Sequence, residues 1–84
     1  EFIGAKFSNC DFKGGRFTNF RRGIQFVGAR FTDCDFQEAD FGYANLTNAV
    51  LINIDVSSGS MCFQNRTGAV FTNIEYDNRT QCWP

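Results

Sequence analysis

The stretch FVGARFTDCDFQEADFGYANL, residues 26–46, places a large apolar residue at every fifth position. The same spacing continues on both sides, and nine of the eleven phenylalanines follow it, all but Phe20 and Phe63. A small or apolar residue, most often Ala, stands two positions before each large one, with a mostly polar residue between them. Residues two apart point to the same side of an extended chain, so the large and small residues share an interior. The expected core ladder is Phe7, Phe12, Phe17, Phe26, Phe31, Phe36, Phe41, Leu46, Leu51 and Phe71.

A period of five fits neither an α-helix nor a continuous flat strand. It fits a short extended segment that turns a corner every five residues. If all large residues are to meet in one interior, the chain must coil into a tube. Successive coils then pair like strands, about 4.8 Å apart.

The units GAKFS (4–8), EADFG (38–42), YANLT (43–47) and NAVLI (48–52) resemble the A(D/N)LXX repeat of the pentapeptide-repeat family. The resemblance includes thylakoid-lumenal and cyanobacterial-type members. It implies an all-β fold, a right-handed quadrilateral β-helix with four repeats in each coil and about four coils in this chain. The tail from Tyr76 to Pro84 resembles the segment that follows the repeats in this family.

These patterns predict a single domain with three parts. Residues 1–56 form the repeat β-helix, and residues 69–84 form the last repeats and a C-terminal cap. Between them, residues 57–68 are expected to form an irregular loop or a short helical turn, because Ser-Ser-Gly-Ser is a breaker signal and Arg66 holds a central position. Residues 17–26 are also irregular: either one repeat has lost a residue or a corner bulges outward.

The four cysteines fall into two classes. Cys10 and Cys34 occupy the small interior position and are predicted to be buried and unpaired. The resemblance implies twenty residues per coil, which places Cys62 one coil below Cys82, within reach of a disulfide. The alternative is a pair of free thiols in a reducing cytosol; we favour the disulfide.

The charges and residue types argue against several functions. The net charge of −1 gives no general affinity for nucleic acid, although the first thirty residues are basic and the remainder acidic. No apolar run approaches the roughly 20 residues of a membrane span. The chain has no histidine and no phosphate-binding loop. We therefore expect a non-enzyme without a catalytic residue, cofactor or metal.

One charged pattern is ordered. Asp35, Asp55 and Glu75 precede large residues at intervals of one coil, so they are expected to stack into an acidic ladder. Asp33, Glu38 and Asp40 extend this candidate partner surface. It indicates a docking site for a basic partner or a weak cation site, unless Asp and Asn are simply the usual residues at that position. A basic cluster of Arg16, Arg21, Arg22 and Arg30 is the corresponding candidate for an acidic partner.

The predicted function is a structural or protein-interaction module, an accessory subunit of a larger assembly such as a membrane or photosynthetic complex. The expected partner is another protein or a large complex, not nucleic acid. The N-terminal coil edge is expected to be covered by missing chain, a second copy or the partner. A disulfide suits the thylakoid lumen or another oxidising compartment, such as the periplasm or the cell exterior. The alternative is a DNA-mimicking, topoisomerase-binding protein of the quinolone-resistance type.

Overall fold

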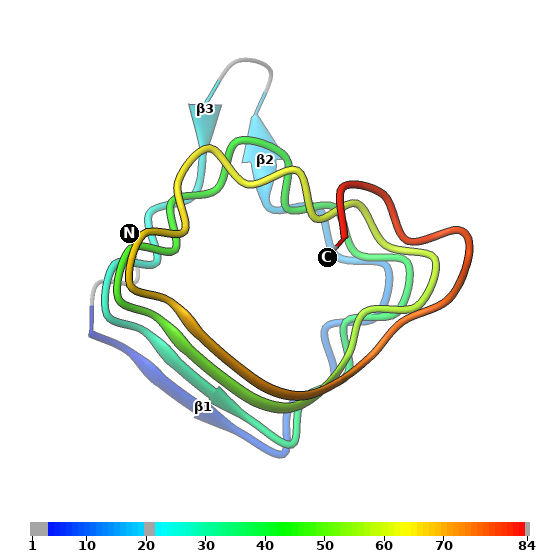
Figure 1. The fold of residues 1–84 in the computed structure, drawn as a ribbon, viewed down its shortest axis with the longest axis horizontal. Coiled ribbons are helices and arrows are strands. Elements are labelled where there is room, and N and C mark those ends of the chain that lie inside the picture. The colour runs from blue at the N-terminus through cyan, green and yellow to red at the C-terminus, as the bar shows by residue number, and fades with distance from the viewer. Residues whose placement is uncertain (1–3, 20–21, 84) are drawn as a thin grey trace.

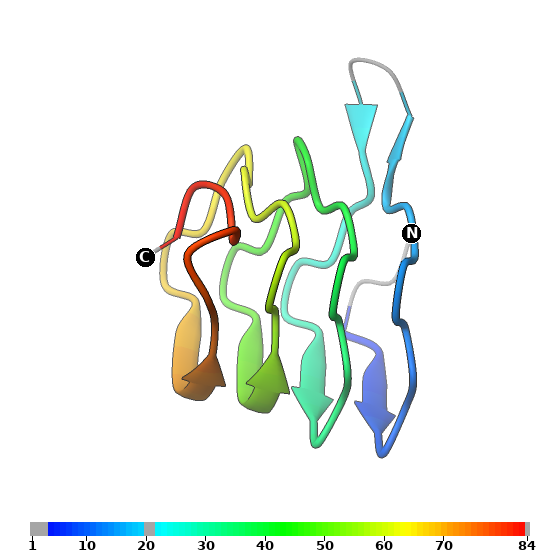
Figure 2. The same ribbon diagram turned by 90° about the vertical axis from the view of Figure 1, so that its right-hand side faces the viewer.

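The chain winds into a four-sided tube held by parallel strand pairings (Figure 1). The computed structural model describes residues 4–19 and 22–83. Strands from successive coils form one sheet in the order β1-β4-β5-β6. Their bounds are Lys6–Ser8 for β1, Arg30–Thr32 for β4, Val50–Asp55 for β5 and Val70–Glu75 for β6. The coils stack along the tube axis (Figure 2), and the described residues contain no helix, hence none long and apolar enough to cross a membrane.

A short hairpin projects from one corner of the first coil (Figure 1). Its strands, β2 (Thr18–Asn19) and β3 (Arg22–Gly23), pair antiparallel. The hairpin lengthens the first coil: Lys6 pairs with Arg30, 24 positions later, whereas Arg30 pairs with Val50, 20 positions later. Of the two alternatives for residues 17–26, the structure therefore has the outward bulge.

Left-handed backbone conformations turn the chain at its corners. We call the large inward residue of each repeat the central residue, and the residue two places after it the corner position. Positive φ occurs at these corner positions: Gly4, Asn9, Gly14, Gly28, Asp33, Glu38, Tyr43, Asn48, Asn53, Ser58, Gly68 and Asn73. Gly, Asn and Asp adopt this conformation at least cost, and they hold nine of the twelve positions. The five-residue period is thus also a period of corners.

The core is a set of stacked aromatic rings along the tube axis. Rings stack face to face between coils, as Phe12 does on Phe36 with centroids 5.0 Å apart. Around a coil they meet edge to face, as Phe36 meets Phe41 at 4.9 Å. Both arrangements suit the ring quadrupole. The fully buried members of the expected core ladder are Phe26, Phe31, Phe36, Phe41, Leu46 and Leu51.

The other four members of that ladder are only partly buried: Phe7, Phe12, Phe17 and Phe71. For Phe7 and Phe12 this corrects an expectation of near-complete burial. The first three rings belong to the first coil, so among the described residues only one neighbouring coil packs against them. Phe71 belongs to the last coil, where Trp83 lies edge-on against it at 4.9 Å.

Residues 57–68 differ from their expectation, because the coil continues through them in register. Ser60 bridges to Asp40 of the preceding coil, and Asn65 bridges to Asn45. Met61 is buried at the central position, an inward residue that the sequence analysis missed. The Ser-Ser-Gly-Ser signal marks an ordinary corner, with positive φ at Ser58, rather than the end of the tube. The departure is confined to the next repeat, whose central residue, Arg66, is exposed.

The segment after β6 is fastened to the preceding coil by Asp77. Its carboxylate accepts hydrogen bonds from the backbone and hydroxyl of Ser58, at 2.9 and 3.0 Å. It also accepts bonds from the backbone of Arg79 and Thr80. These donors favour the charged form, first among them the Ser58 amide, and lower the pKa of Asp77 to about 2.

Acid is therefore expected to loosen the C-terminal cap. Because the folded-state pKa of Asp77 lies below its ordinary value of 3.8, this carboxylate stabilises the fold above that value, and the contribution is lost as the pH falls through about 2. An NMR titration of the Asp77 carboxyl carbon should give the low midpoint, and amide exchange at residues 77–81 should accelerate across the same window. In Ser58→Ala the midpoint should move upward. A wild-type midpoint at or above the ordinary value would contradict the hydrogen-bonding scheme.

Candidate functional site

Four acidic side chains line up along one side of the tube. Each stands at the outward position, directly before a central residue. Asp11 bridges to Asp35, Asp35 bridges to Asp55, and Asp55 pairs with Glu75 in the β5–β6 register. We call these four residues the acidic ladder. The coil stays in register through residues 57–68, which the predicted stacking of Glu75 on Asp55 requires. Asp11 is an additional member of the ladder.

Asp11 escaped the sequence analysis because of the hairpin. With a constant twenty-residue coil, Asp11 would not stack on Asp35; the longer first coil brings the two side by side. The available signal was the irregular spacing between Phe17 and Phe26, read as an outward bulge. If the residues of the bulge are left out of the count, Asp11 lies one coil before Asp35 and belongs to the ladder.

The aspartates of the ladder also have a structural role. One carboxylate oxygen of Asp35 accepts the backbone N–H of Gln37 at 2.9 Å, and Asp55 does the same for Ser57 at 2.9 Å. Asn45, at the outward position of another side, accepts the N–H of Thr47 at 3.1 Å. Aspartate and asparagine are equivalent for this turn-closing bond. What distinguishes the ladder is therefore its charge.

A second polar column runs beside the ladder at the neighbouring corner. It consists of Asn9, Asp33, Asn53 and Asn73, all with positive φ. The Asn53 amide donates to Asp33 at 2.8 Å, and the Asn73 amide donates to Asn53 at 2.7 Å. The corner positions 33, 53 and 73, twenty residues apart, were the sequence signal for this column.

The two columns form the walls of an open groove of about 610 Å³ along the tube. Cys10, Cys34 and Ile54 line it between them. Of the candidate partner surface, Asp33, Asp35, Asp55 and Glu75 line the groove, whereas Glu38 and Asp40 do not. Glu38 lies at the following corner, and Asp40 bridges to Arg16 on the next side.

The groove carries an excess of negative charge. Among the described residues, one ion pair reaches it, from the exposed Lys13 to the half-buried Asp35 at 3.9 Å, and such a long pair near the surface neutralises little of the charge. The Gln37 amide donates to Asp55 at 2.6 Å. Burial tends to raise the pKa of Asp55, but hydrogen bonds from Ser57 and Gln37 outweigh it and lower that pKa. The carboxylate is therefore held in its charged form at neutral pH.

Two arginines of the expected basic cluster, Arg16 and Arg30, lie on different sides of the tube. Arg16 lies beside Asp40, whereas Arg30 pairs with Lys6 on the side that carries the sheet. Arg21 lies outside the described residues. The tube therefore separates basic residues that are close in the sequence.

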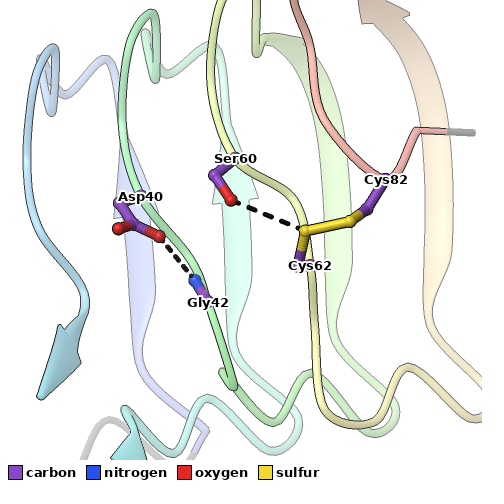
Figure 3. Close-up of a disulfide and its surroundings, with 5 residues drawn as sticks. All are labelled: Asp40, Gly42, Ser60, Cys62 and Cys82. Atoms are coloured by element: carbon purple, nitrogen blue, oxygen red, sulfur yellow. Dashed lines mark hydrogen bonds between the residues drawn. A yellow bond between two sulfur atoms is a disulfide. The ribbon is translucent and has the colours of Figure 1, made fainter. Parts of the chain in front are cut away.

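The disulfide lies on the side of the tube that also carries Asp40 and Ser60 (Figure 3). It joins Cys62 to Cys82, with Cα atoms 5.1 Å apart, and so ties the C-terminal segment to the preceding coil. This is the pair that the spacing of one coil favoured. Cys10 and Cys34 are free thiols, the first partly exposed and the second buried.

Comparison with known proteins places these repeats in a family. The family described as pentapeptide repeats matches residues 22–57 with 8 copies. Residues 22–57 of this chain therefore carry pentapeptide repeats. Its fold is the right-handed β-helix of that family, as its sequence predicts. A comparison with curated proteins finds no match.

The repeat tube is also similar to solved structures. One trypsin-treated variant of QnrB1, a plasmid-mediated fluoroquinolone resistance protein, is 22% identical with a TM-score of 0.50, and the match covers 88% of this chain. A second variant of QnrB1 is 21% identical over 88% of this chain, with a TM-score of 0.28. This chain spans 47% of the first QnrB1 chain and 61% of the second. At this identity the likeness extends to the fold.

The groove is not arranged as a metal centre. Within residues 4–19 and 22–83, no group of three or more His, Cys, Asp or Glu side chains is placed to hold a metal ion. The carboxylates face outward at the spacing of the coils instead of converging on one point. A row of fixed negative charges suits a long basic partner better than a single cation.

Proposed function

We propose that this repeat protein is a non-catalytic interaction module that binds a basic segment of another protein along the acidic groove. The observation that carries the proposal is the acidic ladder, which places an acid at the same outward position in each described coil. Stacking like charges costs on the order of 1 kcal/mol per pair in water. A basic partner would relieve that repulsion on binding.

The chemistry of the groove supports binding rather than catalysis. A carboxyl group that acts as a general acid at neutral pH needs a raised pKa, whereas the pKa of Asp55 is lowered. In Asp11, Asp35 and Asp55, one carboxylate oxygen already accepts a backbone N–H group and so closes the following turn. Of the remaining oxygens, that of Asp55 accepts the Gln37 amide and that of Asp35 lies 3.9 Å from the Lys13 ammonium. A carboxylate oxygen can accept a further bond from lysine or arginine.

The disulfide supports an oxidising compartment, such as the thylakoid lumen or periplasm. In that setting the module would serve as an accessory subunit of a larger assembly, including a membrane or photosynthetic complex. The alternative, a DNA-mimicking protein that binds a topoisomerase, has less support. The acidic ladder has only four rungs, and the basic residues Lys6 and Arg30 pair on the adjacent side.

The proposal is tested by removing charge from the ladder without removing its turn-closing bonds. In Asp35→Asn/Asp55→Asn, each asparagine retains the oxygen that accepts the N–H two residues on, as Asn45 does. Each exposed charge pair contributes about 0.2–1 kcal/mol, so we expect about 2- to 30-fold weaker association with the partner. The salt dependence of the association should also flatten.

The matched control is Asp40→Asn. Asp40 likewise accepts the N–H of Gly42, at 2.9 Å (Figure 3), but it does not line the groove. Each chain is used to capture proteins quantitatively from native extract at two salt concentrations. The double variant should recover less of the partner than the wild type does, and the control should recover as much. Equal recovery of every protein by all three chains would refute the groove as the binding site.

A further inference from the structure

Two free thiols lie next to each other in the floor of the groove. Cys10 and Cys34 both hold the small inward position, on successive coils, and the neighbouring Asp35 amide donates to the carbonyl of Cys10 at 3.0 Å. The thiol of Cys34 lies against the first coil, 3.6 Å from the carbonyl oxygen of Phe7. Burial raises the pKa of Cys34; the hydrogen bond with the Cys10 backbone lowers it, and the nearby Cys10 thiol raises it again. Both cysteines line the groove. The two sulfur atoms therefore face a common space.

The same tube already closes one disulfide between successive coils. Cys62 and Cys82 are joined across adjacent coils with Cα atoms 5.1 Å apart. Coils that pair as parallel strands lie about 4.8 Å apart throughout, and disulfides form over Cα separations of about 4.4–6.8 Å. Cys10 and Cys34 stand on paired coils too, since Asp11 bridges to Asp35 directly after them. The first coil can thus be closed without a change of register.

We propose that Cys10 and Cys34 are a redox site, which forms a second and reversible disulfide when the protein meets a small disulfide oxidant such as oxidised glutathione. The Cys10 thiolate attacks one sulfur of the oxidant, and a mixed disulfide forms as one glutathione thiolate leaves. The Cys34 thiolate then attacks the Cys10 sulfur, and the second glutathione thiolate leaves. In total the two cysteine thiols lose two electrons and two protons, and the oxidant is reduced to two glutathione thiols.

Exposure sets this order of attack. Cys10 is partly exposed in the groove, whereas Cys34 is 3% exposed. A disulfide in solution therefore reaches Cys10 first, and Cys34 acts as the resolving thiol from within. The product clamps the first coil to the second beside Asp11 and Asp35. The site does not depend on the proposed partner, because its chemistry requires only the two thiols and the oxidant.

Incubation of the native protein with increasing ratios of oxidised to reduced glutathione tests the site. We expect both free thiols to be lost, and non-reducing peptide mapping to find a Cys10–Cys34 link beside the existing Cys62–Cys82 link. Reduced glutathione in excess should restore the two thiols. Amide exchange in the first coil should slow in the linked form.

Two alanine variants separate the steps. Alanine holds this inward position in several other repeats, among them Ala39, Ala44 and Ala49, so both variants are expected to fold. Cys34→Ala should stop at the mixed disulfide on Cys10, and Cys10→Ala should leave Cys34 unmodified. If the wild type remains a mixed disulfide, links two molecules or does not react, the redox site is refuted.

Discussion

Phe36→Ala is expected to lower the free energy of unfolding by about 3–5 kcal/mol. A chain of this length has a total stability of roughly 4–13 kcal/mol, so this substitution removes much of it. Phe36 is fully buried in the middle of the tube, with an exposed fraction of 0%. Its ring stacks on Phe12 and meets Phe31 and Phe41 edge to face, at 5.2 and 4.9 Å. Alanine would leave a cavity that the surrounding rings, fixed by the coils, fill poorly.

Urea denaturation of two control variants shows whether packing is the cause. Phe36→Leu should lose less than half as much, because leucine is fully buried at the same repeat position in Leu46. Phe7→Ala should also lose less, since Phe7 is only partly buried in the first coil. A loss in Phe36→Ala no larger than that in Phe7→Ala would mean that the ring column does not carry the stability of the tube.

The period of five was sufficient to predict the tube, because every repeat makes the same two demands. It needs a large inward residue, and it needs a corner that Gly, Asn or Asp supplies at least cost. Because the same pattern recurs in a dozen repeats, it predicts the fold even where one repeat is irregular. The hairpin at β2 and β3 was left undecided, because nine positions between Phe17 and Phe26 fit either two repeats that have lost one residue or one repeat with an outward bulge.

The segment 57–68 shows the opposite error, in which a local signal was given too much weight. Ser-Ser-Gly-Ser was interpreted as a breaker, yet Gly59, Ser60 and Met61 repeat the order small, polar and large in phase with Val56. A side chain at Gly59 would come within 2.8 Å of the Met61 side chain, so glycine here is the small inward residue of an ordinary repeat. Phase with the neighbouring repeats is the stronger evidence in a solenoid.

The groove could be predicted in part for a similar reason. Equal spacing identified which acids stack, but the second wall depends on hydrogen bonds between corner side chains, such as Asn53 to Asp33. To predict such bonds, one must know which corner lies next to which side of the tube. Charge alone also assigned Asp40 to the surface, although it lies on the following side beside Arg16.

Loss of the Cys62–Cys82 disulfide is expected to lower the free energy of unfolding by about 3 kcal/mol, as the chain-entropy model gives for a loop of this length. The bond spans 20 residues and holds the last segment of the chain. Near it, the backbone connections are the bond from Met61 to the Gln81 carbonyl and the bond from Gln81 to the Gly59 carbonyl. Without the covalent link this end should open first, because it pairs with a coil on one side only.

A mutant cycle isolates the contribution of the covalent bond. Cys62→Ala, Cys82→Ala and the double variant should all lose about the same stability, since each removes one and the same disulfide. Cys34→Ala, which removes a free thiol at a position where alanine is common, should lose much less. Non-reducing peptide mapping of the protein purified without added oxidant should find Cys62 linked to Cys82, with Cys10 and Cys34 free. A Cys10–Cys34 link in that preparation would contradict the expected pairing of the cysteines. Losses that add in the double variant would contradict the expected contribution of the disulfide, because the single variants would then be removing packing and not a shared bond.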